Sequence, residues 1–262
     1  MKIKSITDHL ESIVPLHLQE VYDNAGLIIG DEEANIKSVL ICIDSTEEVI
    51  DEAIRKKCNL VIAHHPIVFC GLKKINGENY VERTIIKAIK NNIAIYAIHT
   101  NLDNIQIGVN KMICNKLGLK NTKILSLKHI SEKMKVGAGM IGELNKPMSE
   151  KDFLFFVKKQ MQTLCIRHTK LFGKKIKRVA VCGGSGSFLL SDAIRQNANI
   201  FITADFKYHQ FFDAEKKIII ADIGHYESEQ FVKELLFELL KKKFPTFVFH
   251  LSKINTNPIN YL

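Results

Sequence analysis

Three short apolar runs of this chain end in a histidine, and each has the length and β-branched composition of a buried strand. The runs and the polar residues that follow them are 59–63 with His64 and His65, 93–98 with His99 and Asp103, and 217–224 with His225 and Glu229. Helical patterns lie between such runs, so strands and helices alternate along the chain. This order predicts an α/β fold with largely parallel sheets.

Histidines gathered at strand ends favour a metal site. Ligands of open α/β sheets bind outside the carboxyl ends of the strands, and His, Asp and Glu side chains hold zinc, manganese or iron. A single histidine at a strand end is more often capped or solvent-facing, but three such segments favour a metal. Because side chains alternate along a strand, His64 and His65 should diverge, which suits two ions side by side. His225 and Glu229 are four residues apart where a helix begins, so they should share one face.

The composition is that of an ordinary globular protein. The 262 residues are 46% hydrophobic and 25% charged, enough for a substantial core in one or two domains. No apolar stretch approaches the roughly 20 residues that cross a bilayer, and charges occupy the N-terminus where a signal peptide needs apolar residues. We therefore expect a cytoplasmic protein with no membrane partner.

The six cysteines form no CxxC pair, and most lie inside apolar runs. This pattern predicts reduced, buried thiols rather than disulfides or a zinc knuckle. Any metal should therefore be held by nitrogen and oxygen ligands.

The net charge of +9 comes mostly from scattered lysines, with short clusters at 174–178 and 241–243. Solvated helix and loop surface explains such a charge, and so does attraction of an anion such as a nucleotide or a nucleic acid. No nucleic-acid motif accompanies the charge, so a nucleic-acid partner rests on charge alone.

The remaining pattern extends the alternation of strands and helices. We expect helices at 5–11, 45–57, 81–91 and 104–117, strands at 38–43 and 136–144, and a helix capped by Ser149. The lysine-rich region 119–137 is less regular and should be a boundary or an edge segment. A glycine turn follows the strand at 179–182; it could present N–H groups to a phosphate or serve only as a tight turn. Thr203, Asp205, Lys207 and His209 follow a further apolar run and could line the same cleft.

Seven segments resemble the Nif-three-like family, whose members are often labelled GTP cyclohydrolase I type 2 homologues. They are YDNAGLIIG (22–30), LVIAHHPIVF (60–69), IYAIHTNLD (95–103), VAVCGGSGS (179–187), FITADFKYH (201–209), IGHYESE (223–229) and TNPINY (256–261). Their order and spacing fit from end to end. Two positions depart from the family pattern: Tyr22 replaces Trp, and Ala204 replaces Gly and so needs a negative φ.

The resemblance implies two intertwined α/β domains: a metal-site domain of residues 1–125 plus 222–262, and a second domain of residues 126–221. It implies a homohexamer built as a trimer of dimers. It also implies a centre of two divalent ions held by His64, His65, Asp103, His225 and Glu229, with His99 close by. Mixed N/O ligands admit Zn, Mn, Fe, Co or Ni.

From this centre we expect a metal-dependent hydrolase that acts on a small anionic substrate such as a nucleotide. Glu229 and His99 are the expected catalytic residues, and Thr203, Lys207 and His209 the expected substrate contacts. If the family label holds, the reaction is hydrolytic opening of the guanine imidazole ring of GTP. The alternatives are a metal-dependent phosphoesterase and a non-catalytic metal-holding ring that binds a protein or nucleic acid.

Overall fold

The computed structural model describes residues 1–130 and 135–262, and it forms two compact units. The first unit consists of residues 1–102 and 232–258, and the second of residues 103–231 and 259–262. Each unit is a sheet with helices on it, so the expected α/β class with two sheets is confirmed. No helix of the described residues is long and apolar enough to cross a membrane.

The first unit has a five-stranded sheet in the order β1-β4-β3-β2-β11. Its elements are α1 (Ile3–Ile13), η1 (Leu16–Leu18), β1 (Gly26–Ile29), β2 (Val39–Cys42), α2 (Glu47–Arg55), β3 (Leu60–Ala63), α3 (Tyr80–Lys90), β4 (Ala94–Ala97), α4 (Thr100–Asp103, whose last residue belongs to the second unit), α9 (Val232–Lys243) and β11 (Phe249–Leu251).

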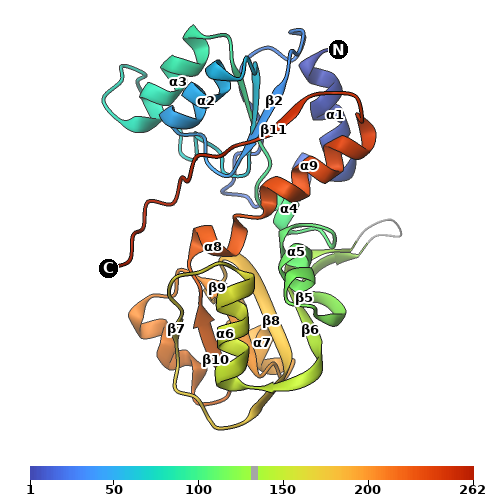
Figure 1. Ribbon diagram of the computed structural model, residues 1–262, viewed down its shortest axis with the longest axis vertical. Coiled ribbons are helices and arrows are strands. Elements are labelled where there is room, and N and C mark those ends of the chain that lie inside the picture. The colour runs from blue at the N-terminus through green and yellow to red at the C-terminus, as the bar shows by residue number, and fades with distance from the viewer. Residues whose placement is uncertain (131–134) are drawn as a thin grey trace. The chain divides into compact units, whose positions relative to one another are not determined.

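Four strands of this sheet are parallel, and only the edge strand β1 is antiparallel. Every residue of β2, β3 and β4 is buried, because α2 and α3 cover one face and α1 and α9 the other (Figure 1). Burial on both faces explains why these strands are continuous apolar runs. The parallel pairing of β3 with β4 brings their carboxyl ends, and the histidines that follow, to one edge of the sheet.

The second unit has a six-stranded mixed sheet in the order β5-β6-β8-β9-β10-β7. Its elements are α5 (Val109–Lys116), β5 (Lys120–Ile130), β6 (Lys135–Ser149), α6 (Glu150–Gln160), β7 (Arg167–His168), β8 (Lys175–Ser185), η2 (Ser187–Leu189), α7 (Leu190–Arg195), β9 (Ile200–Ala204), η3 (Tyr208–Ala214), β10 (Ile219–Asp222) and α8 (His225–Glu229).

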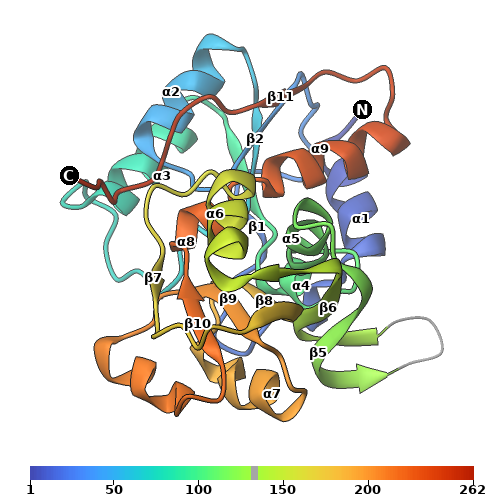
Figure 2. The ribbon, with the colours of Figure 1, turned by 60° about the horizontal axis from the view of Figure 1, so that its bottom comes forward.

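Parallel pairing is confined to the centre of this sheet, between β8, β9 and β10. The expected edge segment at 119–137 is an antiparallel pair, since β5 is the edge strand and pairs with β6; residues 131–134 lie outside the described residues. Helices α6 and α7 lie on opposite faces of the sheet (Figure 2). As the sequence predicts, Ser149 caps α6, its hydroxyl oxygen accepting the N–H of Asp152 at 3.2 Å.

The compact units divide the chain differently from the expected domains. Residues 103–125 belong to the second unit because α5 packs on β6 and β8, and β5 pairs with β6. Residues 222–231 belong there too, because β10 pairs with β9 and α8 packs on β8. Asp103, His225 and Glu229 are therefore in the second unit, whereas His64, His65 and His99 are in the first.

Candidate metal centre

Three histidines of the first unit converge at the carboxyl ends of β3 and β4. One ring nitrogen of each of His64, His65 and His99 lies within 4.8 Å of the other two. The ring centroids of His64 and His65 are 4.9 Å apart. The expected divergence of these two rings is therefore wrong. The strand ends at Ala63, so the alternation of strand side chains no longer applies to them.

The Nδ1 atom of each of these rings meets an oxygen. His64 Nδ1 lies 2.8 Å from the carbonyl oxygen of Ile98. His65 Nδ1 lies 2.7 Å from Asp44 Oδ1, and His99 Nδ1 lies 2.7 Å from Asp23 Oδ1. Because carbonyls and carboxylates only accept, Nδ1 carries a hydrogen in all three rings, which leaves Nε2 as the ring atom that could bind a metal. Metal-binding histidines are oriented in this way in proteins.

The Asp23 carboxylate is fully buried, and the predicted site residue with which it pairs is His99. Its Oδ2 accepts the backbone N–H of Thr100 at 3.0 Å and also the Thr100 hydroxyl. Burial by itself would raise the pKa of Asp23, but the hydrogen bonds from His99 and Thr100 lower it to about 2. Asp23 is therefore ionised at neutral pH and fixes the His99 ring.

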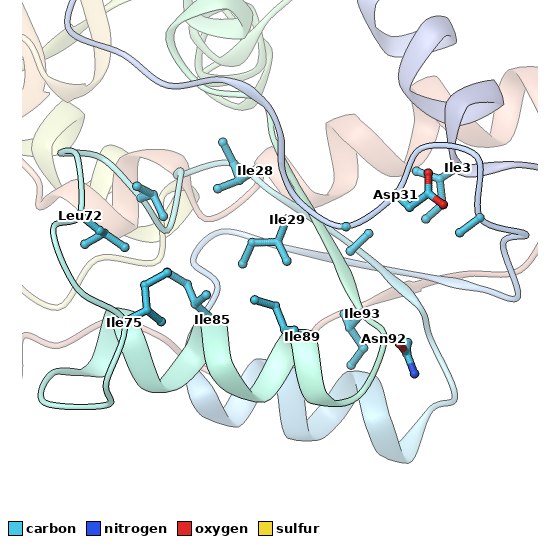
Figure 3. A pocket seen from close by; sticks show the side chains of 14 residues that line it. Ile3, Ile28, Ile29, Asp31, Leu72, Ile75, Ile85, Ile89, Asn92 and Ile93 are labelled. Atoms are coloured by element: carbon cyan, nitrogen blue, oxygen red, sulfur yellow. The ribbon is translucent and has the colours of Figure 1, made fainter.

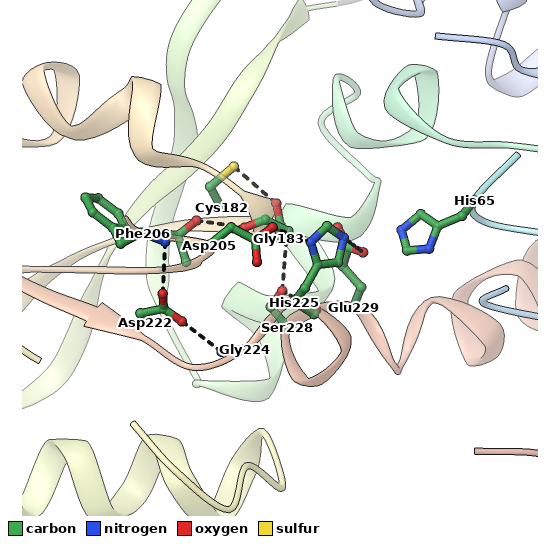
Figure 4. Close-up of polar contacts among 12 residues, drawn as sticks. His65, Cys182, Gly183, Asp205, Phe206, Asp222, Gly224, His225, Ser228 and Glu229 are labelled. Atoms are coloured by element: carbon green, nitrogen blue, oxygen red, sulfur yellow. Dashed lines mark hydrogen bonds and ion pairs between the residues drawn. The ribbon is translucent and has the colours of Figure 1, made fainter. Parts of the chain in front are cut away.

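In the second unit, His225 and Glu229 share one face of the single-turn helix α8, as their spacing predicts. His225 Nε2 lies 3.1 Å from Glu229 Oε2, and Nδ1 lies 2.6 Å from Asp205 Oδ2 (Figure 4). Burial lowers the pKa of His225, but the carboxylates of Glu229 and Asp205 outweigh this and raise it to about 11. Without a metal, the ring is therefore an imidazolium between two carboxylates.

The glycine turn expected after residue 182 lies within the last residues of β8, where the pairing with β9 is irregular, and it makes room for these side chains. Gly184 has φ 59°, and a Cβ there would lie 2.4 Å from Glu229 Oε1 and 3.2 Å from the His225 ring. Asn110 Oδ1 accepts the Gly183 N–H at 3.0 Å, and Ser228 Oγ accepts the Gly184 N–H at 2.8 Å. Of the two readings of this segment, the structure disfavours the phosphate site, because these two N–H groups are already engaged by side chains.

Asp103 brings a second carboxylate to this part of the second unit. One of its oxygens lies within 4.8 Å of a Glu229 oxygen. Burial raises the pKa of the neighbouring Cys182 thiol, and the charges of Asp103 and Glu229 raise it further. Cys182 is therefore a neutral thiol, in keeping with the free, mostly buried cysteines of this chain.

The expected substrate contacts differ in their surroundings. Thr203 is fully buried, and its hydroxyl donates to the Gly184 carbonyl at 3.0 Å, so it supports the glycine turn. Lys207 and His209 are exposed, at the start of η3. Ala204 has no positive φ; the left-handed residue of this turn is Asp205, at φ 58°. The replacement of glycine by Ala204 is therefore accommodated.

Asp205, which the sequence placed in the cleft, orients the His225 ring, whereas Asp44 and Asp23 were not assigned from the sequence. Asp44 follows the end of β2 in the same way as the histidines follow β3 and β4, so the strand-end rule could have found it. Asp23 lies in a loop 76 residues from its partner, within the 22–30 segment that carries the resemblance, but that segment does not show that it pairs with His99.

A separate hollow of the first unit, about 650 Å³ in volume, contains none of the predicted site residues. Ile85 and Ile89 of α3 face Ile28 and Ile29 of β1 across it (Figure 3). Its lining is almost entirely aliphatic, with Asp31 as the one carboxylate among the lining residues. This hollow offers no set of donors that could hold a metal or a polar substrate.

Comparisons with known proteins support the predicted resemblance. Residues 1–258 match the family described as Duf34/NIF3 (NGG1p interacting factor 3). A Clostridium acetobutylicum protein named GTP cyclohydrolase 1 type 2 homolog is 36% identical over 230 residues, which cover 87% of this chain and 85% of the relative. A Clostridium perfringens protein of the same name is 33% identical over the full length of both chains.

Solved structures also support the predicted resemblance. A Staphylococcus aureus hypothetical protein matches with a TM-score of 0.91 at 31% identity, covering 100% of this chain and 99% of that one. A Bacillus cereus protein related to NIF3 matches with a TM-score of 0.93 at 26% identity and the same coverage. The resemblance read from the seven segments is confirmed.

Proposed function

Since the chain belongs to the Duf34/NIF3 family, we propose that it is a dinuclear metal-binding protein and a metal-dependent hydrolase acting on a nucleotide. The proposed ligands are His64 and His65 of the first unit, and Asp103, His225 and Glu229 of the second. His99 is a proposed catalytic residue near the ions. The relatives' name, GTP cyclohydrolase 1 type 2 homolog, supplies the candidate substrate class.

One observation carries the proposal: four histidines have Nδ1 hydrogen-bonded to an oxygen acceptor. Three of these acceptors are carboxylates, Asp44, Asp23 and Asp205, and the fourth is the Ile98 carbonyl. Packing does not require this arrangement, whereas metal coordination through Nε2 does benefit from it. The donor set of imidazoles and carboxylates suits Zn, Mn, Fe, Co or Ni.

Bound divalent ions would lower the pKa of a shared water and polarise the substrate. Side chains of this protein would transfer the proton and contact the substrate. Asp23 fixes the His99 ring with hydrogen on Nδ1, so His99 Nε2 can take a proton from the attacking water and return it to the leaving group. Glu229, held close to Gly184, is the proposed bridging carboxylate. Lys207 and His209 are the proposed contacts to an anionic substrate.

The test is a hydrolysis assay with GTP and other nucleoside triphosphates, using protein reconstituted with each candidate metal. Formate release that disappears with chelator supports the cyclohydrolase, and phosphate release without formate supports the phosphoesterase. A metal-loaded protein that releases neither from any nucleotide contradicts the enzymatic proposal and favours a metal-holding binding protein. His17→Ala, which changes an exposed histidine outside the proposed centre, should leave the rate unchanged.

The resemblance also supports a homohexamer as the assembly that carries this centre. Light scattering should then give six times the chain mass of 29.8 kDa. A monomer or dimer mass at micromolar concentration would contradict this part of the proposal.

A further inference from the structure

The second unit contains a hollow of about 640 Å³ that none of the proposed metal ligands lines. One wall comes from β7 and the loop after it, and the other from η3 and the turn that follows it. Ala214 and Ile218, both buried, contribute to the lining. The volume is typical of small-molecule sites, which range over roughly 300–1,000 Å³.

Aromatic rings form much of this lining. Tyr208 and Phe212 of η3 are 73% and 67% exposed. Their centroids are 5.7 Å apart in an edge-to-face arrangement, so each keeps ring surface toward solvent. Phe211 differs, because the Arg167 guanidinium lies over its ring at 5.5 Å. Tyr208 and Phe212 therefore offer stacking surface for a planar group.

The lining is also positively charged. Lys170 and Lys216 are exposed and form no ion pair within residues 1–130 and 135–262. The one carboxylate among the lining residues, Glu215, is paired with Lys217 at 2.5 Å. The two lysines thus leave two uncompensated positive charges beside the rings, and these charges complement an anion.

We propose that this hollow binds a nucleoside phosphate, with the base against Tyr208 and Phe212 and the phosphate near Lys170 and Lys216. Stacking surface beside uncompensated lysines is the combination that holds a base and its phosphate. The limited volume suits one nucleotide rather than an extended strand. The site is separate from the proposed metal ligands, so its occupancy does not depend on the proposed hydrolase.

The experiment is a calorimetric titration of the full-length protein, as purified and with excess EDTA, using adenosine monophosphate as the probe. Saturable binding that survives EDTA is expected. Phe212→Ala should weaken it about tenfold, as the loss of one stacking ring does, and Lys170→Glu should weaken it to a similar degree. The controls are Phe155→Ala, at a ring 70% exposed on α6, and Lys159→Glu on the same helix, and neither should change the affinity.

The proposal would be overturned if adenosine monophosphate showed no saturable binding or if EDTA abolished the binding. It would also be overturned if the α6 control substitutions weakened the binding as much as Phe212→Ala and Lys170→Glu do. Inorganic phosphate binding as tightly as the nucleotide would show that the rings contribute nothing. A thymidine oligonucleotide that binds where the mononucleotide does not would identify a strand surface instead. Because all four substitutions are at exposed positions, the variants should fold, and circular dichroism checks that they do.

Discussion

At the scale of single residues, the histidines of this chain differ from ordinary strand-end histidines in what their Nδ1 atoms contact. His65 is the clearest case, because its partner Asp44 is itself held by the Thr256 hydroxyl. Burial raises the pKa of Asp44, but the hydrogen bonds from His65 and Thr256 lower it overall, so the carboxylate is ionised. An ionised partner both orients the ring and makes Nε2 a stronger donor to a metal.

Asp44→Asn should therefore weaken metal binding by about 10- to 100-fold, the usual effect of losing such a partner. Competition with a chromogenic chelator measures the dissociation constant. Asp8→Asn, at an exposed acid of α1, is the control and should match the wild type. Equal affinities for Asp44→Asn and the wild type would mean that Asp44 does not act on a metal ligand.

At the scale of elements, the glycine turn of β8 determines how closely Glu229 approaches the backbone. Gly184→Ala would place a methyl group 2.4 Å from Glu229 Oε1 and also impose a left-handed alanine. Gly173→Ala imposes the same backbone cost at φ 75° with no atom within 4 Å of the new methyl. Both variants should lose about 1–2 kcal/mol of unfolding free energy.

Only Gly184→Ala should also lose metal, since Glu229 must move, whereas a methyl group on Gly173 meets no atom within 4 Å. Urea unfolding and metal analysis of the two variants separate the effects. If both keep the wild-type metal content, the position of Glu229 does not matter for metal binding.

The C-terminal segment after β11 is tied to α2 through Glu52. Ser252 Oγ donates to Glu52 Oε2 at 2.6 Å, and the Lys253 N–H lies 3.2 Å from Oε1. Burial raises the pKa of Glu52, but Lys56, Ser252 and Lys253 together lower it below its usual 4.5. A lowered folded-state pKa stabilises the fold above pH 4.5, and this contribution is lost as the pH falls through the folded pKa.

Glu52→Gln should therefore lower the free energy of unfolding at pH 7, and the loss should become progressively smaller below pH 4.5. Urea unfolding of the variant and the wild type at these pH values measures this loss. Glu48→Gln, at an exposed acid of the same helix, should show no such trend. A cost for Glu52→Gln that stays constant with pH would contradict the role of the ionised carboxylate.

At the scale of the whole molecule, the sequence predicted the strands that bear the histidines better than it predicted their partners. Buried parallel strands are continuous β-branched runs, so 59–63 and 93–98 were recognisable. Asp44, Asp23 and Asp205 meet their rings across 21, 76 and 20 residues, and such pairings follow from the folded chain rather than from local spacing. The helix expected at 104–117 begins only at Val109, because an irregular turn first follows α4.

The edge strand β5 was anticipated only in part, because the sequence left 119–137 as either a boundary or an edge segment. Its exposed face carries lysines that resemble a surface loop, although charged side chains are also how proteins protect a sheet edge. Because β5 pairs with β6, residues 103–125 fall in the second compact unit, whereas the resemblance implies the metal-site domain for them.

The most direct test of the central claim is the metal content per chain, measured by elemental analysis of the wild type beside His65→Ala/Glu229→Ala. These substitutions remove one proposed ligand from each unit, and His17→Ala is the matched control. Two equivalents of a transition metal in the wild type and the control, with nearly none in the double variant, is the predicted result. A wild type that stays metal-free after reconstitution would contradict the metal centre and the hydrolase proposed from it.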